Sequence, residues 1–146
     1  MSVDERNLLA TAFKNLVGQH RIAFRTVNVL IGNSRYKLHK PSLEKYRDEV
    51  ATRLNESCEM VMKTVKEQIM TKPANKEEAR VYFLKMIGDY CRYKTETLEF
   101  QPEKREAVCK EASKCYEDAN AVNLGPCSST RLGLILNMSV FYYEIC

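Results

Sequence analysis

The chain has 146 residues, the size of one ordinary domain, and combines 45% apolar with 29% charged residues and few glycines or prolines. This composition excludes a disordered chain and favours an all-helical protein. A formal charge of +4 from 23 basic and 19 acidic residues is too balanced for a general nucleic-acid-binding surface, so nucleic acid is not an expected partner.

Two further classes are disfavoured by the pattern of residues. The longest apolar run falls short of the roughly 18 residues of a membrane-spanning helix, and no signal-peptide pattern opens the chain. We therefore expect a cytoplasmic protein without a membrane partner. The six cysteines show no Cys-x-x-Cys spacing and the two histidines fit no metal-ligand register, so we expect reduced thiols and neither a metal nor a cofactor.

The first helix is predicted from a capping box. Ser2-Val3-Asp4-Glu5 has serine at the cap position and glutamate three residues later, and apolar periodicity then continues to about Ile31. The segment "GNSRYKLHKP" interrupts this pattern. Periodicity and turn residues predict further helices over about residues 42–70, 76–98 and 102–122 and from about residue 130 onward. We expect an all-α antiparallel array of about five helices, forming a single domain over residues 1–146.

Narrow cationic stripes are predicted on two of these helices. At 100° per residue, Lys14, Arg21 and Arg25 fall close together on the first helix, between apolar flanks. On the third helix, Lys85 and Arg92 lie seven residues apart, on one stripe. Guanidinium groups match phosphate oxygens bidentately, so cations gathered in one groove would suit a phosphate dianion.

The last helix is apolar almost all round, which is typical of a buried helix. Its one polar stripe carries Asn137 and Glu144, and a groove shared by the three helices would gather all the polar stripes, with the hydroxyl of Tyr93 nearby. Ordinary alternatives remain open at this point. The cations can be solvated or paired with acids on their own helix, Asn137 and Glu144 can form a satisfied buried pair or a cap, and Tyr93 can be a core aromatic.

Three segments carry a resemblance to a known family. "ERNLLATAFKNLVGQHRIAFR", "YFLKMIGDYCRY" and "RLGLILNMSVFYYEI" resemble the third, fifth and seventh helices of 14-3-3 proteins, in the family's order. The resemblance implies a dimeric adaptor of signal transduction that binds phosphoserine or phosphothreonine peptides. It assigns the phosphate to Lys14, Arg21, Arg92 and Tyr93, and it assigns the peptide groove to Arg25, Lys85, Leu136, Asn137, Val140 and Glu144.

The sequence also departs from the pattern of the family. Met1 falls where the family's third helix begins, so we expect a truncated and divergent member without the first two and last two helices. A groove that lacks part of its apolar wall should bind more weakly.

Three functions follow from this reading. The first is a phosphopeptide-binding adaptor that is not an enzyme, since no P-loop, nucleophile–histidine arrangement or metal set is found. The second is a structural subunit that pairs with a full-length 14-3-3 protein and does not itself bind phosphorylated proteins. The third is a degenerate gene product.

Overall fold

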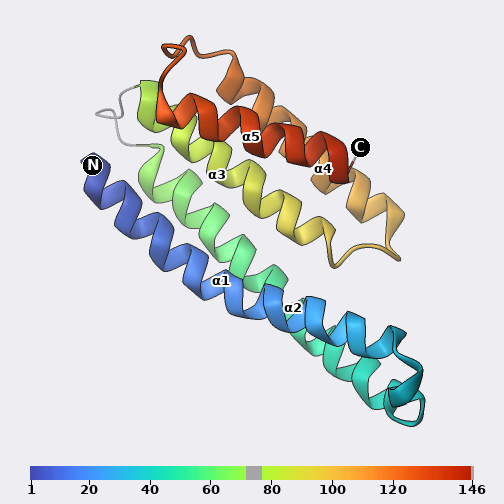
Figure 1. Cartoon of the computed structure of the whole chain (residues 1–146). Coiled ribbons are helices and arrows are strands. Elements are labelled where there is room, and N and C mark those ends of the chain that lie inside the picture. The colour runs from blue at the N-terminus through green and yellow to red at the C-terminus, as the bar shows by residue number, and fades with distance from the viewer. Residues whose placement is uncertain (72–76, 146) are drawn as a thin grey trace. The chain divides into compact units, whose positions relative to one another are not determined.

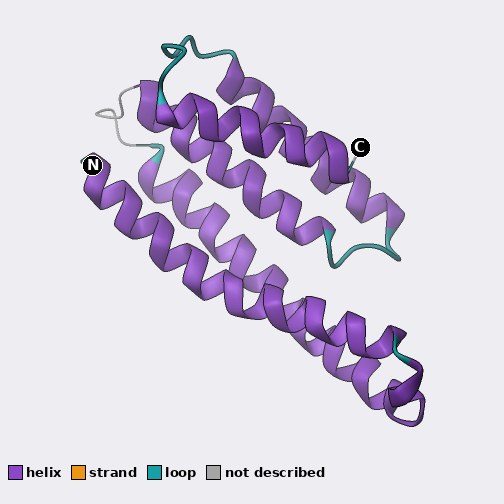
Figure 2. Cartoon of the chain, viewed as in Figure 1, coloured by secondary structure: helices purple, strands orange, loops and turns teal. Residues whose placement is uncertain are grey.

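The computed structural model describes residues 1–71 and 77–145, and within them it contains helices and no strand (Figures 1 and 2). The predicted all-α fold is confirmed. The five α-helices are α1 (Val3–Gly32), α2 (Lys40–Thr64), α3 (Glu77–Thr95), α4 (Pro102–Asn120) and α5 (Ser129–Glu144). The chain divides into two compact units, Met1–Cys58 (unit 1) and Glu59–Cys146 (unit 2), with the boundary inside α2.

The capping box at the start of α1 is confirmed. The Ser2 hydroxyl accepts a hydrogen bond from the Glu5 backbone N–H at 3.1 Å, and the Glu5 carboxylate accepts one from the Ser2 N–H at 2.6 Å. This reciprocal pair satisfies two backbone donors that a helix start otherwise leaves without partners. The helix ends at Gly32, close to the predicted Ile31.

The segment after α1 is more helical than its sequence suggested. A 3₁₀-helix, η1 (Ser34–His39), fills most of the predicted break, and the side chain of Asn33 accepts from the Arg35 N–H at its start. α2 then begins at Lys40 and is followed directly by a π-helical turn, η2 (Val65–Ile69). The predicted helix over residues 42–70 therefore has nearly the right extent, but its last turn uses wider hydrogen bonds, such as Met70 N–H to Val65 C=O.

The remaining helices agree with the sequence pattern to within a few residues. α3 ends three residues before the predicted limit, and Lys76, its predicted start, lies outside the described residues. α4 begins with Pro102 in its first turn, as expected, and ends two residues early. The Ser128 side chain caps α5 by accepting from the Arg131 N–H.

Unit 1 buries one face of each of its helices. In α1 the buried apolar side chains are Phe13, Val17, Phe24 and Val27, and in the part of α2 that belongs to unit 1 they are Val50, Leu54 and Cys58. These positions follow helical spacing, so the apolar face is continuous along each helix. The rest of α1 carries both polar side chains and exposed apolar ones, such as Leu8, Ile22 and Val29.

Unit 2 is built around α3. This helix contacts both α4 and α5, which also contact each other. Val81, Phe83 and Ile87 of α3 are almost completely buried, as are Tyr116 of α4 and Phe141 of α5, whose ring centroids lie 5.4 Å apart. Because α3 is packed on several sides, its polar residues are held in fixed positions.

The residues of unit 2 that precede α3 also pack against it. The Cys91 thiol contacts the Met62 sulfur at 3.5 Å, and Lys94 forms an ion pair with Glu59 at 2.8 Å. The five cysteines among the described residues are free: Cys58, Cys91, Cys109, Cys115 and Cys127.

The last helix is apolar almost all round but is buried along one face only. Only Leu134 and Phe141 of α5 are buried, whereas Leu132, Leu136 and Tyr143 are exposed. The reason is that α5 has only one packed face, against α3 and α4. Among the described residues, no helix is long and apolar enough to cross a membrane.

Candidate functional site

The cationic stripe of α1 lies in unit 1. Lys14 and Arg25 are exposed and Arg21 is half-buried. Val17 and Phe24, which interleave with these cations along the helix, are buried. The packing of the apolar face therefore holds the three basic side chains on one side of a well-anchored helix.

Arg92 of α3 is a buried cation in unit 2, with only 7% of its surface exposed. Its guanidinium lies 3.9 Å from the Asp89 carboxylate and 3.7 Å from the Glu144 carboxylate, and 4.9 Å from the centroid of the Tyr93 ring. Burial works to lower its pKa, but the Tyr116 hydroxyl, Tyr93, and the Asp89 carboxylate more than offset this, so the pKa is raised. Arg92 is therefore fully charged inside the protein.

The ion pairs of Arg92 are loose. Charge-assisted hydrogen bonds between nitrogen and a carboxylate are about 2.7–2.9 Å long, and both of its carboxylate contacts exceed this by most of an ångström. The buried Nε of Arg92 also has no hydrogen-bond partner within the described part of the chain. A buried guanidinium held this loosely retains capacity for another anion.

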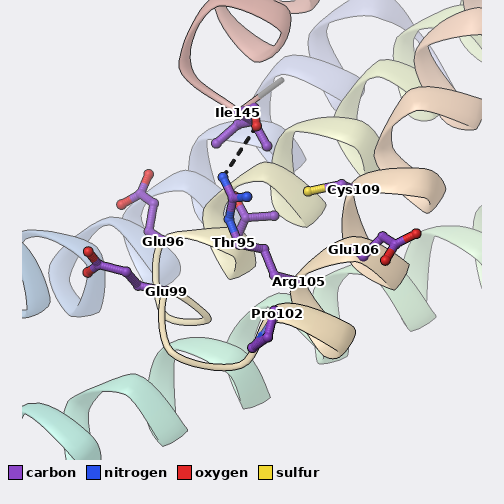
Figure 3. A pocket seen from close by; sticks show the side chains of 8 residues that line it. All are labelled: Thr95, Glu96, Glu99, Pro102, Arg105, Glu106, Cys109 and Ile145. Atoms are coloured by element: carbon purple, nitrogen blue, oxygen red, sulfur yellow. Dashed lines mark hydrogen bonds between the residues drawn. The ribbon is translucent and has the colours of Figure 1, made fainter.

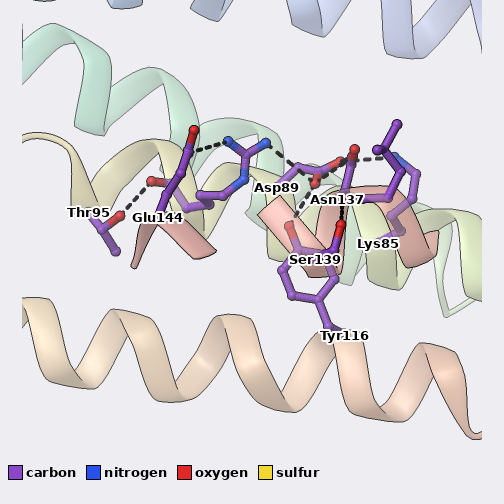
Figure 4. Close-up of polar contacts among 9 residues, drawn as sticks. Lys85, Asp89, Thr95, Tyr116, Asn137, Ser139 and Glu144 are labelled. Atoms are coloured by element: carbon purple, nitrogen blue, oxygen red, sulfur yellow. Dashed lines mark hydrogen bonds and ion pairs between the residues drawn. The ribbon is translucent and has the colours of Figure 1, made fainter. Parts of the chain in front are cut away.

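Asp89, one turn before Arg92, is the centre of a tight hydrogen-bond network (Figure 4). Its carboxylate accepts from the Lys85 ammonium at 2.9 Å and from the Tyr116 hydroxyl at 2.7 Å. The side-chain amide of Asn137 donates to both carboxylate oxygens at 2.8 Å. The carboxylate thus joins α3, α4 and α5. We call Lys85, Asp89, Arg92, Asn137 and Glu144 the α3–α5 cluster.

The structure therefore brings together most of the predicted residues that lie in unit 2. Lys85 and Asn137 meet at Asp89, and Glu144 meets Arg92. Tyr93 is half-buried beneath the Arg92 guanidinium. Leu136 and Val140 flank Asn137 on α5, the first exposed and the second half-buried. The ordinary alternative holds in part for Lys85, which is paired with an acid on its own helix.

Comparison with known proteins agrees with the family resemblance found in the sequence. The sequence matches the profile of the family described as 14-3-3 protein, over residues 1–146. The chain belongs to the 14-3-3 family. It is 40% identical over 149 residues to 14-3-3-like protein 1 of Caenorhabditis elegans and 38% identical over 152 residues to 14-3-3 protein 3 of Entamoeba histolytica. The 14-3-3 protein zeta of Bombyx mori is 38% identical over 149 residues.

The similarity extends over the whole chain but over only part of each relative. It covers 99% of this 14-3-3 chain in all three comparisons, against 58%, 62% and 59% of the respective relatives. The chain thus spans about three-fifths of the length of these relatives. The resemblance seen in three segments is confirmed as family membership.

Two residues of this 14-3-3 chain that organise the site were not predicted as site residues. Asp89 was visible only as an acid at helical spacing from Lys85 and Arg92, which is equally typical of a surface ion pair. Tyr116 had no local signal, because its partner lies 27 residues away, on another helix. Neither role is encoded in the spacing within one helix.

A pocket of about 630 Å³ lies at the C-terminal end of α3, where Thr95, the start of α4 and Ile145 line it (Figure 3). Three glutamates line it, Glu96, Glu99 and Glu106, together with Arg105, whose guanidinium donates to the Ile145 carbonyl at 3.3 Å. None of the predicted phosphate or groove residues is among its lining residues. Its acidic lining is unsuited to a phosphate group.

Proposed function

We propose that this 14-3-3 chain is a phosphopeptide-binding adaptor without catalytic activity, which binds phosphoserine or phosphothreonine segments of other proteins. The observation that carries the proposal is the burial of Arg92 together with its long distances to the neighbouring carboxylates. Arg92 has a buried, charged guanidinium whose two carboxylate neighbours lie too far away for good hydrogen bonds. A phosphate dianion offers negatively charged oxygens at hydrogen-bonding distance, which the guanidinium does not have in the carboxylates of Asp89 and Glu144.

In the proposal, Arg92 and Tyr93 of α3 hold the phosphate in unit 2, and Lys14 and Arg21 of α1 are kept as phosphate residues on the family resemblance alone. Tyr93 contributes a hydroxyl donor and also supports the Arg92 guanidinium through its ring. Lys14 and Arg21 add cations from one stripe of a single helix. Together these cations would balance the negative charge of the phosphate group, which is about −1.5 to −2 at neutral pH.

In this proposal, the Glu144 carboxylate pairs with Arg92 when no peptide is bound. It is exposed, unlike Arg92, and its contact with Arg92 is loose. An incoming phosphate competes with it for the guanidinium, and the released glutamate is free to face a basic residue of the peptide. Arg25, Lys85, Leu136, Asn137 and Val140 complete the proposed peptide groove.

The test is fluorescence polarisation with a phosphoserine peptide and its unphosphorylated twin. We expect selectivity for the phosphorylated peptide that is strongest at low salt, since screening weakens contacts exposed to water. Arg21→Glu or Arg92→Glu should abolish selectivity, because each reverses a charge at the proposed phosphate site. Lys104→Glu is the matched control, since Lys104 is exposed on α4.

Equal binding of both peptides at low salt, or selectivity that survives Arg92→Glu, would refute the proposal. The structural-subunit hypothesis would then lead, in which the chain pairs with a full-length 14-3-3 protein. Co-purification with such a protein would test it directly.

A further inference from the structure

We infer that Asp89 is the positioning residue of the peptide groove: it holds the side-chain amide of Asn137 so that the carbonyl oxygen faces outward and selects a main-chain N–H of the bound peptide. This inference rests on the proposed function for its ligand and on the family resemblance for the expectation that Asn137 binds the main chain of the peptide. It assigns a role to a residue that contacts the ligand only through another.

The orientation of the Asn137 amide follows from the chemistry of its partner. An ionised carboxylate has only acceptors, so the group that faces Asp89 must be the Nδ2 donor. Nδ2 lies 2.8 Å from both carboxylate oxygens, which fixes the direction in which the amide nitrogen points. The carbonyl oxygen Oδ1 must then point away from Asp89, and because Asn137 is only half-buried, a ligand can reach it.

Asp89 is itself held firmly enough to impose this orientation. Only 7% of its surface is exposed, and its carboxylate also accepts from Lys85 of its own helix and from Tyr116, which is fully buried. Three donors from three helices leave the carboxylate little freedom to rotate. The Asp89 carboxylate, which accepts the hydrogen bond from Asn137, is therefore held in one position.

The same network decides what the α3–α5 cluster offers a ligand. Lys85 is paired at 2.9 Å and the Nδ2 group of Asn137 faces Asp89, so the cluster presents the Arg92 guanidinium beside a neutral carbonyl acceptor. An extended peptide provides a matching pair, a phosphate and a main-chain N–H. If the amide were free to turn over, it would present a donor to peptide N–H groups half of the time and lose this selectivity.

The first experiment needs no ligand. The two side-chain amide protons of Asn137, assigned by their loss in Asn137→Leu, should exchange with solvent about tenfold more slowly than those of the exposed Asn123. Replacing Asp89 by leucine, which has a similar shape and no acceptor, should remove the protection. Equal exchange of Asn137 and Asn123 in the unaltered protein would overturn the inference whatever the protein binds.

The second experiment uses a phosphopeptide series in which one backbone amide at a time is replaced by an ester, which removes one N–H. In the unaltered protein we expect one position where the ester weakens binding by about three- to tenfold. That penalty should vanish in Asn137→Leu, which lacks the acceptor, and equally in Asp89→Leu. A general loss of structure would weaken all the peptides alike and would leave the ester penalty in place.

The matched control is Glu106→Gln, which neutralises an exposed acid on α4 and should preserve the ester penalty. An ester penalty that persists in folded Asp89→Leu would overturn the inference while phosphate selectivity stands. Absence of phosphate selectivity in the unaltered protein would instead refute the proposed function. If Asp89→Leu fails to fold, Tyr116→Phe gives the second variant: it leaves the carboxylate less restrained, and should reduce both the exchange protection and the ester penalty.

Discussion

Gly88 and Tyr116 lie so close that α3 has no room for a side chain at this position. A Cβ atom built on Gly88 would lie 2.8 Å from both Cε1 and Cζ of the Tyr116 ring, which is fully buried. This close approach brings the hydroxyl of the same ring to Asp89, the residue after the glycine. The absence of one methyl group therefore permits the contact between α4 and the α3–α5 cluster.

Gly88→Ala should destabilise the protein, although alanine is the better helix former. The ring of Tyr116 has no exposed space into which it could move, so the added methyl group forces a shift of packed helices. We expect the free energy of unfolding to fall by about 1–3 kcal/mol, as measured by urea denaturation.

Gly133→Ala is the matched control for that substitution. Gly133 is also inside a helix, but a Cβ atom there meets nothing within 4 Å. Only the helix propensity should act, which raises the free energy of unfolding by up to about 1 kcal/mol. Similar effects from the two substitutions would contradict the packing argument.

The Cys91 thiol should make the protein less stable at alkaline pH. Burial, reinforced by the negative charges of Glu111 and Cys115, raises its pKa from 9.0 to about 12. The unfolded chain then releases this proton at a lower pH than the folded protein. Stability from this group is complete below about pH 9 and is lost as the pH rises toward 12, at up to about 1.4 kcal/mol per pH unit.

Urea denaturation between about pH 8 and pH 10 measures this dependence. Cys91→Ala should make the fall with pH less steep, whereas Cys127→Ala, at an exposed position, should leave it unchanged. A part of the fall should persist in both variants, because burial also raises the pKa of Tyr116. An identical pH profile for Cys91→Ala and the unaltered protein would show that the buried thiol does not titrate as argued.

The exposed face of α5 should make the 146-residue chain bind hydrophobic dye and self-associate. This face carries Leu132, Ile135, Tyr142 and Tyr143, and Tyr143 is 91% exposed. Apolar side chains gathered on one exposed face are typical of surfaces that associate with other proteins. Dye fluorescence and sedimentation velocity measure the two effects.

Leu132→Lys combined with Tyr143→Lys should reduce both dye binding and self-association. Leu38→Lys is the control, since Leu38 is 93% exposed but belongs to η1 of unit 1 and not to α5. A monodisperse chain with a cooperative melt and no dye binding would be inconsistent with this prediction.

The sequence by itself determined where the helices lie and what each helix carries. The capping box at Ser2 and the proline at the start of α4 act through backbone groups within a few residues, so a linear pattern contains them completely. The stripe of Lys14, Arg21 and Arg25 is likewise a property of one helix with a fixed angle per residue. The similarity of three such segments to a known family was also present in the linear order.

Only the tertiary structure decided how the polar residues of different helices are satisfied. Asn137 and Tyr116 meet Asp89 from 48 and 27 residues away, and the exposure of Leu136 depends on which face of α5 finds a neighbour. Spacing along one helix gives the direction of a side chain but not what lies opposite it. A buried donor takes the acceptor that packing places within about 3 Å, and that distance is set by how closely the helices approach, here by a glycine that admits a tyrosine ring.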